Sequence, residues 1–285
     1  MLHGVKGDNC LSQYFCQGAV QYFNMTIAEI TQKILNSPKY SALDSRVVER
    51  VVAESVRRYG LKRAQHEAKR VLHQVWGVYF GELKPAKLRD ADLDSLLQLH
   101  QSTRERLPFL RDFYEQIFTI TGQPSTIVDY ACGLNPLAFY HLGYDYPGHY
   151  QALDIDHFTV DLLNQQFQKL GVANRFNARP GDLLLDKPIK ADIALLLKVL
   201  PPLELQRKGA SRDILQKQNS RFTVVSYPLK SISGYEKGMG DFYRQQFYAA
   251  IQDQGMKVTE LPFANELVFV IDKHESSPPG VDVLK

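Results

Sequence analysis

The chain has 285 residues, of which 44% are hydrophobic and 23% are charged, and its formal net charge is +3. The length fits one large domain or two ordinary ones, and the composition is that of a globular protein. No run of eighteen apolar residues occurs, so we expect no membrane-spanning helix. The three cysteines, Cys10, Cys16 and Cys132, are too sparse for a disulfide framework, so we expect a reducing, cytoplasmic location.

The first predicted elements are all helices. Residues 1–24 have no helical or strand period and no secretory pattern, so we expect a disordered extension, with Met25 as an alternative start of the product. Apolar residues then recur at helical spacing, and Asp44 or Ser45 is a suitable cap for the second helix, which Gly60 ends. Since no strand pattern interrupts these helices, residues 25–120 are predicted to form a helical N-terminal subdomain.

Strands and helices alternate from residue 125 onward. Strands are predicted at 126–130, 149–154, 174–178, 191–197, 222–227, 257–261 and 266–272, and helices at 136–142, 157–170, 203–217 and 240–254. This alternation predicts a mostly parallel sheet, but the last two strands are joined by only "PFANE" and should be antiparallel neighbours. We therefore predict an α/β, class I (Rossmann-like) methyltransferase domain over residues 121–273, with a seven-stranded sheet. Residues 274–285 are expected to be a disordered tail.

Acidic residues follow the first two predicted strands of this domain. The stretch "IVDYACGLNP" (127–136) carries Asp129 at the end of a strand and Gly133 in the following turn. Asp154 and Asp156 end the second strand, where an acid can accept hydrogen bonds from both ribose hydroxyls of a nucleoside. The alternatives are an ordinary strand–turn–helix joint at 127–136 and a solvent-facing turn acid at Asp154.

A third acid, Asp182, follows the third strand, where it can accept from the amine of adenine while Leu183 packs on the ring. Three acids at successive strand ends point to a bound nucleoside. Neither GxxxxGK[ST] nor a full GxGxxG occurs, so a cofactor with no phosphate fits better. We predict S-adenosylmethionine as the cofactor and expect no metal. Lys198, at the end of the fourth strand, is either a cation at the cofactor or target edge or a surface lysine.

A strongly basic region lies between residues 39 and 73. It contains nine Lys or Arg against four acids, a net charge of +5, which exceeds the +3 of the whole chain. A helical surface of this charge can follow phosphates, so we predict RNA binding; the alternative is a solvated helix face. The predicted RNA contacts, with one in the loop after the fifth strand, are Arg46, Arg50, Arg57, Arg58, Lys62, Arg63, Lys69, Arg70 and Lys230.

The loop "LKSISGYEKGMG" (229–240) lies where the target should enter. Its glycines allow movement, Lys237 can meet a phosphate or base, and Met239 offers an apolar surface for a flipped base. The alternative is an ordinary flexible loop.

Five segments in order, "HQSTRERL" (100–107), "DYACGLNPLA" (129–138), "LLLKVLPPLE" (195–204), "SYPLKSISGYEKGM" (226–239) and "NELVFVI" (265–271), resemble the aminoglycoside-resistance 16S rRNA methyltransferases. The resemblance extends from about Met25 to Asp272, and one mild departure is Tyr227, where the family usually has phenylalanine. It implies methylation of N7 of guanosine 1405 in the decoding A site of the assembled small (30S) ribosomal subunit.

The resemblance also implies roles for individual residues. Gly133, Asp154, Asp182 and Leu183 match cofactor-contact positions, and Arg104 matches an arginine that clamps the methionine carboxylate. Without the resemblance, Arg104 is better explained by a surface salt bridge. Guanine N7 carries a lone pair and no proton, so no general base is expected, and Met239, Lys198 and Lys237 are predicted to position the target base. The rival functions are a methyltransferase for another RNA or a small molecule, and a non-catalytic ribosome-binding factor.

Overall fold

The computed structural model describes residues 25–77, 88, 91–144, 146–229, 238–252 and 254–276. Contacts within the chain divide it into two compact units, Met1–Gln74 and Val75–Lys285. The expected extension at 1–24 and most of the expected tail lie outside the described residues. No helix within the described ranges combines the length and the apolar stretch that a membrane span requires.

The N-terminal unit is helical, as the periodicity predicts. It contains α2 (Ile27–Leu35), α3 (Ser45–Tyr59) and α4 (Leu61–Leu72), and a π-helical turn, η1 (His73–Gly77), crosses its boundary. Thr26 and Glu29 form a capping box at the start of α2, and Asp44 caps α3 through the backbone N–H of Arg46. The predicted apolar stripes of these helices form the core, with Ile30, Ile34, Val47, Val48, Val51, Val52, Ala64, Ala68 and Leu72 all buried.

The second unit is an α/β domain around a seven-stranded sheet. The strands are β1 (Thr126–Tyr130), β2 (His149–Asp154), β3 (Phe176–Pro180), β4 (Ala191–Leu197), β5 (Ser220–Pro228), β6 (Met256–Pro262) and β7 (Glu266–Ser276). Their order is β3-β2-β1-β4-β5-β7-β6. The first five pair in parallel and β7 runs antiparallel to both β5 and β6, which confirms the predicted topology.

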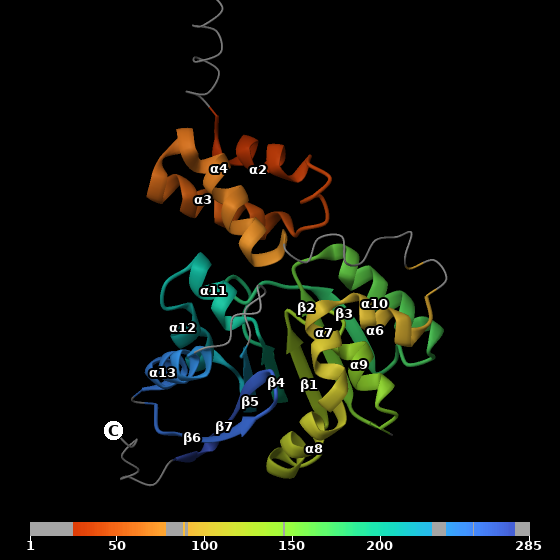
Figure 1. The fold of residues 1–285 in the computed structure, drawn as a ribbon. Coiled ribbons are helices and arrows are strands. Elements are labelled where there is room, and N and C mark those ends of the chain that lie inside the picture. The colour runs from red at the N-terminus through yellow and green to blue at the C-terminus, as the bar shows by residue number, and fades with distance from the viewer. Residues whose placement is uncertain are drawn as a thin grey trace, which may run out of the picture. The chain divides into compact units, whose positions relative to one another are not determined.

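Helices cover both faces of this sheet (Figure 1). One face holds α6 (Leu93–Leu99), α7 (Gln101–Arg106), η2 (Leu107–Phe109), α8 (Leu110–Thr121), α9 (Asn135–His141) and α10 (His157–Lys169); the other holds α11 (Leu200–Gln206), α12 (Ala210–Lys217) and α13 (Met239–Ile251). Each face has its own apolar core, and strand residues alternate between them: Ile193 and Leu195 join the first core, Ala194 and Leu196 the second.

The structure corrects two predicted boundaries. Helices α6 to α8 do not extend the N-terminal unit to residue 120, because they belong to the second unit and pack Leu97, Phe113 and Ile117 into the core of the sheet. Helical periodicity reveals a buried face but not the core that covers it. The predicted helix at 203–217 is two helices, separated at Gly209, whose left-handed backbone (φ 81°) begins α12.

Candidate functional site

The turn after β1 is shaped by two residues with positive φ, Ala131 (φ 53°) and Gly133 (φ 50°). The backbone N–H of Cys132 donates to the carbonyl oxygen of Leu153 at 3.0 Å, which ties the turn to β2. The ring of His100 lies directly against Gly133, because a Cβ on that residue would lie 2.5 Å from His100 Cε1. Only glycine fits here, on grounds of both backbone conformation and space.

Asp154 at the end of β2 holds this turn in place. Its Oδ2 accepts from the backbone N–H of Gly133 and its Oδ1 from the backbone N–H of Asp156, both at 3.0 Å. A carboxylate has about four lone-pair sites, so two backbone donors leave Asp154 able to accept from ribose hydroxyls. Burial raises the pKa of Asp154 to about 6, against the lowering effect of the Gly133 hydrogen bond.

Asp156, the second acid after β2, has a local structural role. Its carboxylate caps α10 by accepting from the backbone N–H of Phe158 and the hydroxyl of Thr159, each at 3.0 Å. Burial raises the pKa of this carboxyl above its ordinary value. A cofactor contact by Asp156, as predicted, would therefore use a carboxylate that already caps α10.

Asp182 and Leu183 follow β3 beside Asp154, as predicted from the sequence. The backbone N–H of Gly181 donates to the carbonyl oxygen of Asp154 at 3.0 Å, so the ends of β2 and β3 lie together. Asp182 is buried and its Oδ1 accepts from the backbone N–H of Leu184 at 2.8 Å, which fixes the turn that carries Leu183. Leu183 itself is half-buried.

Asp129 lies at the end of β1, but it is only 1% exposed. Its Oδ2 accepts from the Tyr150 hydroxyl at 2.7 Å and from Asn135 Nδ2 at 2.8 Å, while its Oδ1 has no hydrogen-bond partner. Burial raises the pKa of Asp129 to about 6, although both hydrogen bonds act to lower it. Asp129 is thus a buried acceptor at the end of β1 and not an exposed ligand.

A buried ion pair that the sequence analysis did not predict lies beside Asn135 and Asp129. Arg106, at the end of α7, is 2% exposed and donates to both carboxylate oxygens of Glu266, at 2.6 and 3.1 Å. Its Nη1 also donates to Asn135 Oδ1 at 3.2 Å, so the pair connects with the Asp129 network. Burial acts to raise the pKa of Glu266, but the charges of Arg106 and Lys198 outweigh it and hold that pKa below its ordinary value.

Lys198 lies at the end of β4, the strand that pairs with β1. Its φ is 57°, so Ala131 and Lys198 are the two non-glycine residues with positive φ in the described part of the chain, at the ends of adjacent strands. Such conformations cost roughly 1–3 kcal/mol each and cluster at functional sites. The Lys198 ammonium lies between two carboxylates, 2.9 Å from Glu105 Oε2 and 3.6 Å from Glu266 Oε2.

Arg104, the predicted carboxylate clamp, is an exposed residue of α7. Its Nη1 donates to the carbonyl oxygen of Gln98 at 2.8 Å, and within the described residues it forms no salt bridge of the kind that the alternative explanation requires. His100 is the residue directly before the same helix, and burial, followed by the charges of Arg106 and Lys198, lowers its pKa to about 4. The imidazole facing the turn after β1 is therefore neutral at physiological pH.

The target loop is only partly described. Met239 is a half-buried residue that begins α13, after Gly238 with a φ of 78°. Lys230 and Lys237 lie outside the described residues. Their predicted roles therefore stay predictions.

The predicted RNA contacts of the N-terminal unit lie on α3 and α4, and most are exposed. Several of these arginines form ion pairs: Arg46 with Asp44, Arg57 and Arg58 with Glu54, and Arg63 and Arg70 with Glu67. Since the acids are fewer than the cations, the helices keep their net positive charge. The pairs orient the guanidinium groups without neutralising the surface.

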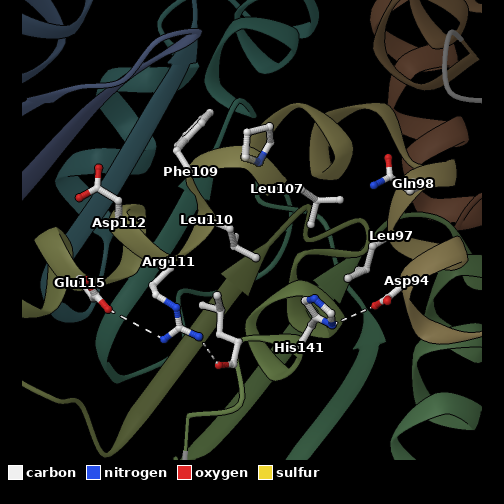
Figure 2. A pocket seen from close by; sticks show the side chains of 12 residues that line it. Asp94, Leu97, Gln98, Leu107, Phe109, Leu110, Arg111, Asp112, Glu115 and His141 are labelled. Atoms are coloured by element: carbon white, nitrogen blue, oxygen red, sulfur yellow. Dashed lines mark hydrogen bonds and ion pairs between the residues drawn. The ribbon is translucent and has the colours of Figure 1, made fainter.

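A cavity of about 620 Å³ lies elsewhere in the domain (Figure 2). Its lining comes from α6, η2, α8 and the end of α9, and several of its polar groups contact one another: His141 lies beside Asp94, and Arg111 beside Glu115 and the Leu142 carbonyl oxygen. Because α9 starts at the carboxyl end of β1 and runs back toward the start of β2, this cavity is at the opposite end of the helix from the acids.

Comparisons with known proteins match this architecture over most of the chain. The sequence model of the family described as "Ribosomal RNA methyltransferase (FmrO)" matches residues 36–270. A relative from Micromonospora echinospora, named 16S rRNA (guanine(1405)-N(7))-methyltransferase, is 35% identical over 269 residues, which cover 87% of this chain and 97% of the relative.

Two solved structures extend the comparison to three dimensions. The 16S rRNA methyltransferase RmtF in complex with S-adenosyl-L-homocysteine has a TM-score of 0.75 at 28% identity and covers 87% of this chain and 99% of its own. The 16S rRNA methylase RmtB has a TM-score of 0.73 at 28% identity, with 88% and 100% covered. On the sequence match and the shared fold, this chain belongs to the ribosomal RNA methyltransferase (FmrO) family.

Proposed function

We propose that the protein transfers the methyl group of S-adenosylmethionine to N7 of guanosine 1405 in 16S rRNA and so confers aminoglycoside resistance. The observation that carries the proposal is the arrangement of Gly133, Asp154 and Asp182 at one edge of the sheet, in a member of a ribosomal RNA methyltransferase family. Open α/β sheets bind ligands outside the carboxyl ends of their strands, which is where these residues lie.

The residues at this edge suit a nucleoside cofactor with no phosphate. Asp154 keeps acceptor capacity for ribose hydroxyls, and Asp182 with Leu183 stands beside it for the adenine ring. Gly133 has no side chain, which lets the turn pass directly against the ring of His100. Arg104 is an exposed guanidinium on the nearby α7, and it is the residue we assign to the cofactor's carboxylate.

Methyl transfer to guanine N7 requires accurate positioning of the base rather than proton transfer. When bound, S-adenosylmethionine supplies an electrophilic methyl group and leaves as S-adenosylhomocysteine. The N7 lone pair lies in the plane of guanine and carries no proton, so the protein needs only to hold N7 in line with the methyl group and exclude water. We assign the holding of the base to Met239 and to the loop before it, including Lys237.

Charge balance at the site agrees with this assignment. Methylation at N7 leaves the base cationic, and an unpaired ammonium beside it would disfavour the product. The Lys198 ammonium is held between Glu105 and Glu266, so its charge is compensated where the base should arrive. We therefore assign Lys198 its role in the site as a cation paired with Glu105 and Glu266.

The substrate assigned here is 16S rRNA within the assembled 30S subunit, and the site of action is the cytoplasm. The support is the basic surface of α3 and α4, which is suited to following phosphates of a structured RNA. A small-molecule methyltransferase would have no use for this surface.

The experiment is expression of the protein in aminoglycoside-sensitive bacteria, scored by survival, with methyl transfer measured in parallel on purified 30S subunits and on free 16S rRNA. We expect resistance, and transfer to 30S subunits in preference to free RNA. The control is Asp154→Ala, which should abolish both. Survival equal to that of empty-vector cells would contradict the proposed function, and equal methylation of free RNA would contradict the 30S assignment.

A further inference from the structure

The end of α7 is fastened to the sheet by four charged residues. Arg106 is bidentate on Glu266 at the start of β7, and the Lys198 ammonium at the end of β4 bridges Glu105 and Glu266. Asn265 Nδ2 also donates to the carbonyl oxygen of Glu105 at 2.8 Å. Two consecutive residues of α7 are therefore tied, through side chain or backbone, to the ends of β4 and β7.

The start of α7 is fastened to the turn after β1. His100 directly precedes the helix, its Nδ1 lies 3.0 Å from the Thr103 hydroxyl oxygen, and its ring packs against Gly133. Gly133 in turn donates to Asp154, so the helix start, the turn and the end of β2 form one connected unit. Six residues of helix are thus held at both ends by the edge that we assign to the cofactor.

Arg104 lies between these two attachments. It is exposed and precedes Glu105 directly, so the position of its backbone is set by neighbours on both sides. A guanidinium that binds a carboxylate must be placed with directional accuracy, since both N–H groups have to meet both oxygens. A short helix of six residues has little stability of its own, and its placement depends on these tertiary contacts.

We propose that Glu105 and Lys198 are positioning residues for the cofactor site: their ion pair, with the Arg106–Glu266 pair behind it, fixes α7 and thereby orients Arg104. This inference rests on the proposed function, since it takes Arg104 to meet the cofactor's carboxylate. Lys198 accordingly serves the cofactor side through α7, in addition to any effect on the target base. Lys198 is itself held at two points, in a left-handed backbone conformation. Its backbone N–H donates to the carbonyl oxygen of Ser226, and its ammonium contacts Glu105 and Glu266.

The test is a double-mutant cycle read by calorimetric titration with S-adenosylhomocysteine. Glu105→Gln and Lys198→Met should each weaken binding roughly tenfold, the scale of one charge-assisted hydrogen bond, and the double variant should lose little more than either. In an Arg104→Ala background, Glu105→Gln should cause no further loss, because the residue through which it acts is gone.

A matched control is Glu115→Gln, which makes the same substitution in an ion-paired glutamate on α8, with Arg111 as its partner. It should leave the affinity unchanged. The side chain of Glu105 is 38% exposed, so Glu105→Gln should fold, and its melting temperature without ligand should stay within about 4 °C of the wild type. A melting temperature that falls while the affinity is kept would mark a merely structural pair and overturn the inference.

Two further outcomes also overturn it. Wild-type affinity in Glu105→Gln would mean that the pair does not position Arg104. An unchanged tenfold loss in the Arg104→Ala background would mean that Glu105 acts on the cofactor without Arg104. Failure of the wild-type protein to bind S-adenosylhomocysteine at all is a different result, since it would overturn the proposed function itself.

Discussion

The backbone N–H of Gly133 donates to Oδ2 of Asp154 at 3.0 Å, and this bond, with that from Cys132 N–H to the Leu153 carbonyl oxygen, joins the turn after β1 to the end of β2. Asp154, the backbone of Gly133 and the ring of His100 therefore lie together at the carboxyl ends of the strands, although they are far apart in the sequence. The bond also leaves part of the Asp154 carboxylate able to accept from a ligand. The first prediction follows from these two roles of the Asp154 carboxylate.

Asp154→Ala should weaken S-adenosylhomocysteine binding by at least tenfold, since each charged hydrogen bond lost costs roughly 1.5–3 kcal/mol. The control is Asp192→Ala at the opposite edge of the sheet, where Asp192 accepts from the backbone N–H groups of Ser125 and Thr126. Both variants remove an acid that joins two segments, so both should lower stability. Equal affinity losses in calorimetric titration would show that the effect of Asp154 is one of stability alone.

The contact between Gly133 and His100 gives a second prediction. Gly133→Ala should abolish cofactor binding, because its Cβ would lie 2.5 Å from the ring and its φ is +50°. His100→Ala in the same chain removes the clash and should restore part of the affinity, leaving the cost of the left-handed backbone, roughly 1–2 kcal/mol. Gly171→Ala measures that cost alone, since its φ is +69° and no atom would lie within 4 Å of the new Cβ. Absence of any rescue by His100→Ala, in the same titration, would contradict the packing argument.

Much of this fold could be predicted from the sequence, and the reasons are local. The run "IALLL" (193–197) is apolar at every position, which is typical of a strand buried on both faces, and the structure places Ile193 and Leu195 in one core and Ala194 and Leu196 in the other. The stretch "PFANE", of which only residues 263–265 lie between β6 and β7, is likewise too short for the crossover that a parallel neighbour needs. The acids at the ends of β2 and β3 were found because parallel strands bring their carboxyl ends to one edge.

The buried charges could not be predicted in this way. Arg106 and Glu266 are 160 residues apart, and neither has a local signal that distinguishes it from a surface residue. Asp129 looked like an exposed ligand because a strand-end acid has the same sequence appearance in either environment, whereas the hydroxyl of Tyr150 and the amide of Asn135 make it a buried acceptor. The boundary at residue 120 failed for a related reason, because the partner of an apolar helix face is a long-range property.

Burial of Asp129 gives a prediction about pH. Its pKa is raised from 3.8 to about 6 in the folded protein, so between about pH 4 and 6 the folded state binds more protons than the unfolded state. This acid therefore favours folding below about pH 4, and its contribution is lost as the pH rises through 6, by about 3 kcal/mol. Asp129→Asn cannot titrate, so the stability advantage of wild type over this variant should shrink over that window. Urea unfolding at pH 4 to 7 measures it, and parallel pH profiles for the two proteins would contradict the assignment.

The basic surface of α3 and α4 gives a prediction about RNA. Arg57→Glu with Arg58→Glu should weaken binding to 30S subunits and flatten its salt dependence, while S-adenosylhomocysteine affinity stays the same. The matched control makes an equal charge change on α12, where Arg212 and Lys217 are exposed. Filter binding to 30S subunits at several salt concentrations measures the affinity and its salt dependence for both variants. Full binding by the α3 variant, or an equal loss in the α12 variant, would remove the support for this surface as the RNA contact.

The central claim is the identity of the modified atom. Purified protein, S-adenosylmethionine and 30S subunits should yield 16S rRNA that borohydride and aniline cleave at guanosine 1405, because N7 methylation makes that base labile, with cleavage read by primer extension. Met239→Ala should keep binding to 30S subunits and lose most of the cleavage, because the base is no longer held in line. A strong stop at 1405 that depends on protein and cofactor is the predicted result. Methyl incorporation with no cleavage at 1405, or cleavage at another guanosine, would contradict the account.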